Sequence, residues 1–221
     1  EPASEADGEN EDGQIGADGN GAPDLPDPPE ELAGTADRLE EMIGNTDPAD
    51  LTDPEMQFNI TAPGSMLIAM GPVITLQFAQ QFDPTMDCPA ISGTLGGDDA
   101  DPDAVVTGDG CTDASGVVYN GSFVYTATQL VFDGYSVTTP SEDCPGETTN
   151  SVYDGGYIYT GNDGVQTQTF IAVTVDSTEL GEDCTQEQGS IGILSTLTME
   201  ETDNGTLLNG EGSLATESEG A

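Results

Sequence analysis

The sequence predicts a mainly β protein: an antiparallel β meander, arranged as a sandwich or an open barrel, with an internal duplication and disulfides. An acidic disordered tail and one to three short helices precede it. Three observations indicate this class. Segments rich in Val, Tyr, Phe and Thr recur after residue 88, Asn-Gly, Asp-Gly and Thr-Gly turns separate them, and all four cysteines lie among them.

Composition divides the chain into four parts. Residues 1–29 are rich in Gly, Asp, Glu and Pro and have almost no apolar side chain, which predicts an acidic disordered tether. A helical segment is expected over residues 30–82 and a disulfide-stapled β domain over residues 83–216. Residues 217–221 are expected to form a short tail.

Two helical regions are predicted before the β domain. Apolar residues spaced by four, three and four positions predict a helix that begins after Pro29 and ends at Gly44, and a second, shorter helix is expected after Asp47-Pro48. The apolar positions of the first helix are Leu32, Ala36, Leu39 and Ile43.

Residues 65–82 are the most hydrophobic part of the chain and predict a buried helix, with a strand as the alternative. Pro72 would either lie in the first turn of a helix that ends at Phe82 or break a helix that begins at Ser65. The segment is shorter than the roughly 20 apolar residues of a membrane span, so no span is expected.

Alternating apolar and polar residues predict seven strands, and Asn204-Gly205 is a typical hairpin turn between the last two. The predicted strands are 104–107, 117–126, 129–137, 151–160, 166–176, 190–199 and 206–214.

A repeated motif predicts how the cysteines pair. Asp-Cys-Pro occurs at 87–89 and 143–145, and Gly-acid-x-Cys-Thr-x-x-x-Gly occurs at 108–116 and 181–189. Zinc binding needs closely spaced pairs, whereas these gaps are wide, so two disulfides are favoured. Four cysteines allow three connectivities, and the duplication favours Cys88–Cys111 with Cys144–Cys184.

The stretch from the first Cys-Pro through Gly-x-x-Cys-Thr-Asp-Ala-Ser-Gly-Val-Val-Tyr-Asn-Gly to Leu-Val-Phe-Asp-Gly-Tyr-Ser-Val resembles a pattern in exported bacterial lipoproteins without assigned function. The resemblance covers about residues 87–137 and implies a cell-envelope β-sheet protein without implying an activity. This chain departs from the pattern in its acidity and in its second copy of the cysteine motif.

The charge excludes several functions. The chain has 43 Asp and Glu, one Arg, no Lys and no His, which gives a formal net charge of −42. Nucleic acids and anionic membranes are therefore poor partners, and cations are favoured ones. Histidine-dependent triads, histidine-ligated metals, P-loop lysines and Schiff-base lysines each lack a required residue.

The chain begins at Glu1 without Met or an apolar leader, as a mature exported protein would. Disulfides indicate an oxidising compartment, hence an extracellular or cell-surface location, and the acidic start suits a tether that follows a lipidated cysteine upstream of Glu1. The absence of Lys and His is typical of marine or hypersaline surroundings, where salt screens self-repulsion; drift in a surface protein is the alternative.

An acidic loop at residues 97–103 is the candidate cation site. Its carboxylates are oxygen donors of the kind that Ca²⁺ takes, although no EF-hand loop is present. A merely solvated loop is the alternative, and no other cofactor is expected. The candidate ligands are Asp98, Asp99, Asp101 and Asp103.

Aromatic residues on one face of two predicted strands are the candidate ligand face. Tyrosines there would stack on sugar rings if the face were exposed, or form a cross-strand aromatic ladder against the core if it were covered. The residues are Tyr119, Phe123, Tyr125, Tyr153, Tyr157 and Tyr159.

The function expected from these patterns is non-catalytic. We expect a structural or adhesive protein of the cell surface or extracellular space, a subunit of a larger assembly with itself or another envelope protein. A carbohydrate-binding module that uses the tyrosine-rich face is the first alternative. A glycosidase with two carboxylates is the second, because such an enzyme needs neither His nor Lys.

Overall fold

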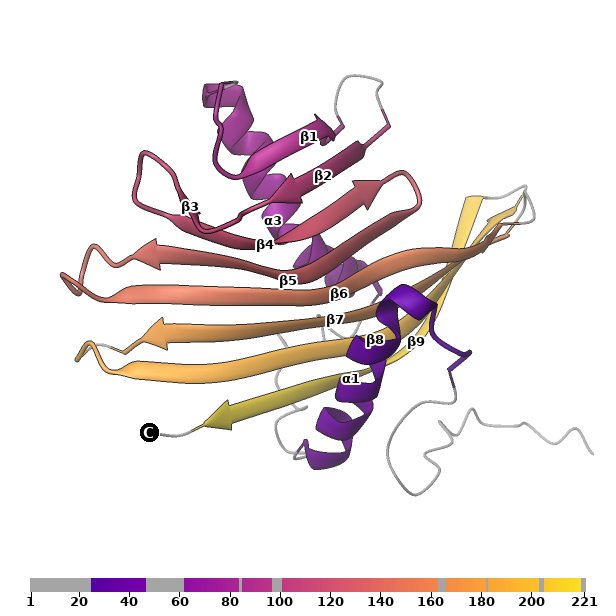
Figure 1. Cartoon of the computed structure of the whole chain (residues 1–221). Helices are drawn as coiled ribbons and strands as arrows, with labels where there is room; N and C mark the ends of the chain where they lie inside the picture. Colours follow the sequence, from indigo (N-terminus) through magenta and orange to yellow (C-terminus); the bar gives the residue numbers. More distant parts are fainter. Residues whose placement is uncertain are drawn as a thin grey trace, which may run out of the picture.

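The protein is one open, twisted antiparallel β sheet with a helix packed on each face (Figure 1). The computed structural model describes residues 25–46, 62–83, 85–96, 101–162, 166–181, 183–202 and 205–219. Helix α1 lies on one face of the sheet and helix α3 on the other. The predicted mainly β, antiparallel class is confirmed.

The sheet has nine strands in the order β1-β2-β4-β5-β6-β7-β8-β9, and β3 pairs with β4 at one side. From β4 onward each strand pairs with the next along the chain, which is the predicted meander. Among the described residues the first and last strands do not pair, so this single sheet neither closes into a barrel nor packs on a second sheet. The strands are β1 (Ala90–Thr94), β2 (Asp103–Thr107), β3 (Cys111–Thr112), β4 (Val118–Thr126), β5 (Gln129–Pro140), β6 (Thr148–Asn162), β7 (Gln166–Leu180), β8 (Gln186–Thr202) and β9 (Gly205–Glu219).

The seven predicted strands correspond to β2 and to β4 through β9. The short strands β1 and β3 were not predicted from the alternation of apolar and polar residues. The later strands are longer than predicted. β9 continues beyond residue 216, where a tail was expected, because its pairing with β8 runs to Glu219 opposite Gln188. Asn204 of the predicted hairpin turn lies outside the described residues, and Gly205 begins β9.

Helix α1 (Ala33–Asn45) follows a single turn of 3-10 helix, η1 (Glu30–Leu32). Its apolar stripe packs on strands β7, β8 and β9, as the residue spacing predicted, and Leu25 packs there too. Ordered contacts therefore begin before residue 29, the predicted end of the tether. The predicted second helix after Asp47-Pro48 lies outside the described residues. The buried residues of this second core are Leu32, Ala36, Leu39, Met42, Phe170, Ala172, Leu194 and Ala215.

Helix α3 runs from Ala62 to Phe82, and Pro72 lies well inside it. Pro72 therefore neither lies in the first turn of the helix nor breaks it, and both predicted positions are wrong. Proline there removes one backbone donor. Ala69 before the proline, and Val73 and Leu76 after it, are buried against the sheet. These contacts stabilise the helix on both sides of Pro72. The strand alternative for this segment is wrong.

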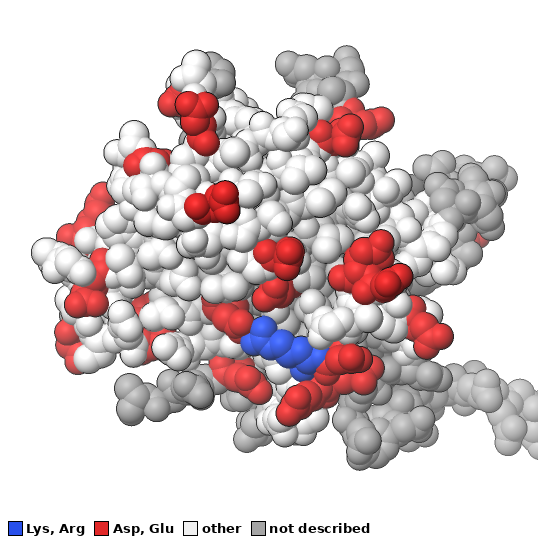
Figure 2. Space-filling model, in the orientation of Figure 1, with Lys and Arg blue, Asp and Glu red and all other residues white. Residues whose placement is uncertain are grey.

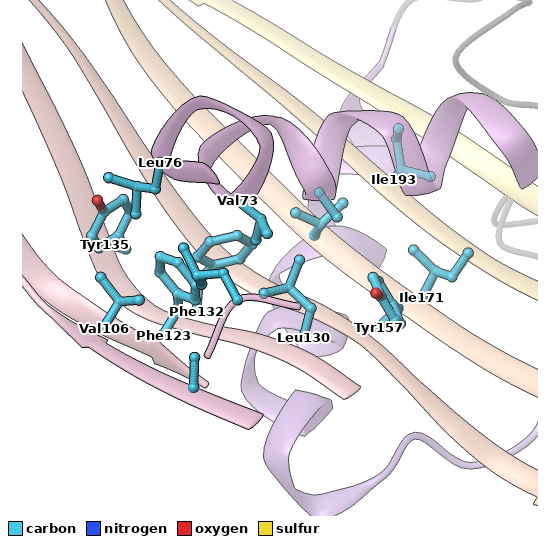
Figure 3. Close-up of a cluster of buried hydrophobic side chains, with 14 of the residues drawn as sticks. Val73, Leu76, Val106, Phe123, Leu130, Phe132, Tyr135, Tyr157, Ile171 and Ile193 are labelled. Atoms are coloured by element: carbon cyan, nitrogen blue, oxygen red, sulfur yellow. The ribbon is translucent and has the colours of Figure 1, made fainter. Parts of the chain in front are cut away.

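The main core lies between α3 and the sheet (Figure 3). Phe123 is its centre: its ring centroid lies 4.9 Å from that of Tyr135 and 5.2 Å from that of Phe132. Successive side chains of a strand point to opposite faces of the sheet, so alternate residues of β7 belong to the two different cores. Ile171 and Val173 face α3, while Phe170 and Ala172 between and beside them face α1.

Candidate functional site

Both predicted disulfides are present, Cys88–Cys111 and Cys144–Cys184, each with 5.7 Å between its Cα atoms. The first ties the segment before β1 to β3. The second joins the β5–β6 connection to the β7–β8 connection, and so links two loops at the same end of the strands. The described residues contain no free cysteine.

The two copies of the repeated cysteine motif share one backbone hydrogen bond. The backbone N–H of Cys111 donates to the carbonyl of Gly108 at 3.0 Å, and that of Cys184 donates to the carbonyl of Gly181 at 2.9 Å. The backbone around this hydrogen bond differs, because the left-handed non-glycine residue is Asp109 in the first copy and Cys184 itself in the second. Their places in the fold differ, because the first turn leads into β3 and the second connects β7 to β8.

The candidate calcium loop is described only in part. Asp98 and Asp99 lie outside the described residues, Asp101 is exposed, and Asp103 begins β2 opposite Thr126 of β4. Within the described residues no group of three or more possible ligands converges. Calcium binding by this loop stays a prediction.

The tyrosine-rich face lies toward the core beneath α3. Tyr119, Phe123 and Tyr157 are buried there, and Tyr125 and Tyr153 pack against the same cluster. Tyr157 and the half-buried Tyr159 have ring centroids 6.2 Å apart. The structure therefore gathers five of the six predicted residues into a ladder beneath α3, whereas Tyr159 lines a groove of about 420 Å³ together with Thr128 and Met199.

Burial also sets the ionisation of these tyrosines. It is the main cause that raises the pKa of Tyr119 to about 12, and the negative charge of Asp113 and a hydrogen bond to it add to the shift. The Tyr119 hydroxyl donates to Oδ2 of Asp113 at 3.1 Å. Burial likewise raises the pKa values of Tyr135 and Tyr157. These are properties of core tyrosines.

A strip of apolar side chains on the outer side of α3 was not predicted. Leu67, Ile74, Phe78 and Phe82, defined here as the α3 stripe, are 54%, 49%, 62% and 75% exposed. At about 100° per residue they fall within an arc of about 80°, opposite the buried side of the helix. The high apolar content of residues 65–82 predicted burial, and the few polar residues are spread around the helix, so they gave no signal for which side would stay exposed.

Arg38, the chain's one basic residue, joins α1 to the sheet. Its Nη2 lies 2.6 Å from Oδ1 of Asp176 on β7, and its Nη1 lies 2.9 Å from Oδ2, so the pair is bidentate. The Ser190 hydroxyl also donates to Asp176. No sequence motif marks Arg38 for this role, although a lone cation among 43 acids is a signal for such a pair.

The ionisation of Asp176 results from opposing effects. Burial acts to raise its pKa, but hydrogen bonds from Arg38 and Ser190, together with the charge of Arg38, outweigh burial and hold the pKa below its usual value. Hydrogen bonding to Asp176 raises the pKa of Arg38 in turn. The pair is therefore fully ionised at neutral pH.

A groove of about 330 Å³ lies beside this ion pair on the α1 face. Figure 2 shows Arg38 in blue with carboxylates around it. Asn150, Gln188 and Glu217 also line the groove, which contains hydrogen-bonding groups for a hydroxylated ligand but no aromatic ring on which a sugar could stack.

No family model, curated protein or solved structure matches this chain. A functional assignment therefore rests on the chemistry of the described residues. In that part of the chain, neither α1 nor α3 combines the length and hydropathy that crossing a membrane requires.

Proposed function

We propose that this protein is a non-catalytic exported protein of the cell surface or extracellular space that serves as a structural or adhesive subunit of a larger assembly. The observation that carries the proposal is the α3 stripe. Two disulfides support an oxidising compartment. The lipoprotein-like cysteine pattern at residues 87–137 supports a place in the cell envelope.

The distribution of exposed apolar side chains supports an assembly role. Seven large apolar side chains are exposed among the described residues, and four of them form the α3 stripe. The remaining three, Val105, Met199 and Leu207, are on separate strands. Isolated exposed apolar residues are ordinary, whereas a contiguous strip marks a surface that another molecule covers.

The carbohydrate-binding alternative is less well supported. It needs exposed rings for stacking, and the tyrosine-rich face packs against α3 instead. The groove beside Arg38 has no aromatic ring among its lining residues, so a sugar there would have hydrogen-bonding groups but no ring on which to stack.

The glycosidase alternative is also less well supported. Asp176 and Glu217 share the groove, but Asp176 is held by Arg38 and its pKa is lowered. A general acid in such an enzyme needs a raised pKa, which comes from burial without a cationic partner.

The test of the assembly role is site-specific photo-crosslinking in the cell that produces the protein. A photo-reactive side chain replaces Phe78 in one variant and Val105, which is 46% exposed on β2, in the control. We expect a discrete adduct from position 78 and none from position 105. Equal, diffuse labelling from both positions, or no adduct from position 78, would overturn the assembly role.

A further inference from the structure

We propose that the α3 stripe is the interface of a homodimer, in which a second copy of this chain packs its own α3 antiparallel on the first. The proposal rests on the assembly role above and names the partner. Such an interface is isologous, because one twofold axis relates the same patch on both copies.

The charge of the surface favours a second copy. Helix α3 contains no Asp, Glu, Lys or Arg, although acids are frequent in the rest of the chain. Two such helices can approach without direct contact between like charges. The remaining repulsion between the two acidic bodies acts over longer distances and is screened by salt, whose Debye length is about 10 Å at 0.1 M and about 3 Å at 1 M.

The order of residues along the stripe is complementary to itself. In an antiparallel pair centred near Ile74, Leu67 lies beside Phe82 of the second copy, and Gly71 lies beside Phe78 of the second copy. Gly71 falls within the same arc, and a Cβ added there would meet no atom within 4 Å. The Phe78 ring therefore has an open place against the glycine backbone of the opposite helix.

The area is sufficient for a weak dimer. Leu, Ile and Phe side chains exposed to this degree each present roughly 100–180 Å², so the stripe offers about 500 Å² on each copy. Two copies would bury about 1,000 Å² in total, which is the lower limit for a specific interface. We therefore expect a dissociation constant of the order of micromolar, and an association that strengthens with salt.

A lipid surface is the competing occupant. Helices that lie on membranes carry Lys and Arg beside their apolar face, and these contact lipid headgroups. α3 has neither, and Arg38 is on α1, where it is engaged with Asp176. Anionic membranes would also repel a chain of formal charge −42.

The experiment is sedimentation velocity on the full chain, from about 1 µM to about 100 µM, which brackets a micromolar constant. We expect a monomer of 22.7 kDa to convert to a species of twice that mass as concentration rises, with tighter association in about 1 M NaCl than in about 0.1 M. Phe78→Glu and Gly71→Glu should each weaken association at least tenfold. Phe78 is largely exposed and packs only on Phe82 among the aromatic residues, and a Cβ at Gly71 meets no atom beyond its chain neighbours, so both variants should stay folded; thermal unfolding checks this.

The matched control is Val105→Glu, which places the same charge on an exposed apolar position of the sheet face opposite α3. It should associate like the wild type. A wild-type chain that stays monomeric throughout, or Phe78→Glu and Val105→Glu that associate equally, would overturn the homodimer. Flotation of the monomer with neutral phosphatidylcholine vesicles would overturn it in favour of lipid.

The crosslinking result separates this proposal from the assembly role. An adduct from position 78 of twice the chain mass supports both. An adduct of another mass, together with a monomeric purified chain, overturns the homodimer and leaves the assembly role standing. No adduct and no association would overturn both.

Discussion

Arg38 illustrates how one side chain can position a whole element. It is the single basic residue of the chain, and it lies on α1 with its guanidinium against Asp176 of β7. Both side chains remain more than one third exposed, so solvent screens the pair and limits its energy. Its main effect is geometric, because a bidentate contact fixes where and how α1 meets the sheet.

Replacing Arg38 with Met should lower the free energy of unfolding by about 1 kcal/mol, because the substitution keeps the aliphatic stem and removes the ion pair. A double-mutant cycle with Asp176→Asn measures the coupling. Since the pKa of Asp176 is lowered in the folded state, the pair stabilises above the unfolded pKa of about 4 and loses that effect as pH falls through the lower folded value. The difference between wild type and Arg38→Met should therefore vanish in acid; a difference that persists there would indicate lost packing instead.

The buried tyrosines predict the alkaline limit of stability. The pKa of Tyr119 is raised to about 12, so its contribution to stability is complete below the unfolded pKa of about 10 and is lost as pH rises from there towards 12. Tyrosinate absorbance should show Tyr119, Tyr135 and Tyr157 ionising together with unfolding. Asp113→Asn should lower the pKa of Tyr119, because it removes a negative charge beside the hydroxyl. Ionisation of all tyrosines near pH 10 with the fold intact would contradict the burial.

The two helices depend on the sheet in different ways. α1 approaches the strands closely: a Cβ built on Gly192 of β8 would collide with the side chain of Leu39. α3 instead crosses the wide aromatic layer and leaves its outer side uncovered. Close contact on one face and an exposed stripe on the other make the molecule asymmetric, although both faces are covered by a single helix each.

Gly192→Ala should lower the free energy of unfolding by about 1–3 kcal/mol, because the added methyl group displaces the Leu39 side chain of α1 from its contact with β8. The control is Gly44→Ala on α1, where an added Cβ meets nothing within 4 Å and higher helix propensity should stabilise the protein by up to about 1 kcal/mol. Denaturant unfolding of the two variants measures both effects. Equal stability of the two would mean that α1 does not rest on this glycine.

At the level of the whole molecule, acidity dominates. Carboxylates spread over the face seen in Figure 2, and Arg38 is surrounded by them. Folding brings these like charges together, so compaction costs free energy that mobile cations reduce by screening. Two disulfides, which close segments of 23 and 40 residues, offset part of that cost by restricting the unfolded chain.

The melting temperature should therefore rise by several degrees as NaCl increases from about 0.01 M to about 1 M, over which the Debye length falls from about 30 Å to about 3 Å. NaCl and KCl should act alike, because screening depends on ionic strength. Scanning calorimetry measures the shift, and matched concentrations of a neutral osmolyte provide the control. A melting temperature that is independent of salt would show that the charges are too far apart in the folded state to repel.

Strand positions and disulfide pairs could be predicted because their signals are local. Alternation of apolar and polar residues located β4 to β9, and the repeated Gly-acid-x-Cys turn paired the four cysteines correctly. The ends of β8 and β9 were set too short, because polar residues there continue the strand by pairing with each other instead of by burial. The same local signals brought Tyr119, Phe123 and Tyr157 onto one face.

Which helix covers each face of the sheet is determined by the tertiary structure alone. The periodicity of α1 shows which of its sides is apolar, but not that Arg38 would meet Asp176, 138 residues away. Apolar residues lie on every side of α3 among a few polar ones, so the sequence alone implies burial without favouring a side, whereas a single helix on an open sheet can bury one side only. Burial of the tyrosine ladder and exposure of the α3 stripe both follow from that placement, because packing between distant segments depends on sheet twist and layer geometry that no local pattern encodes.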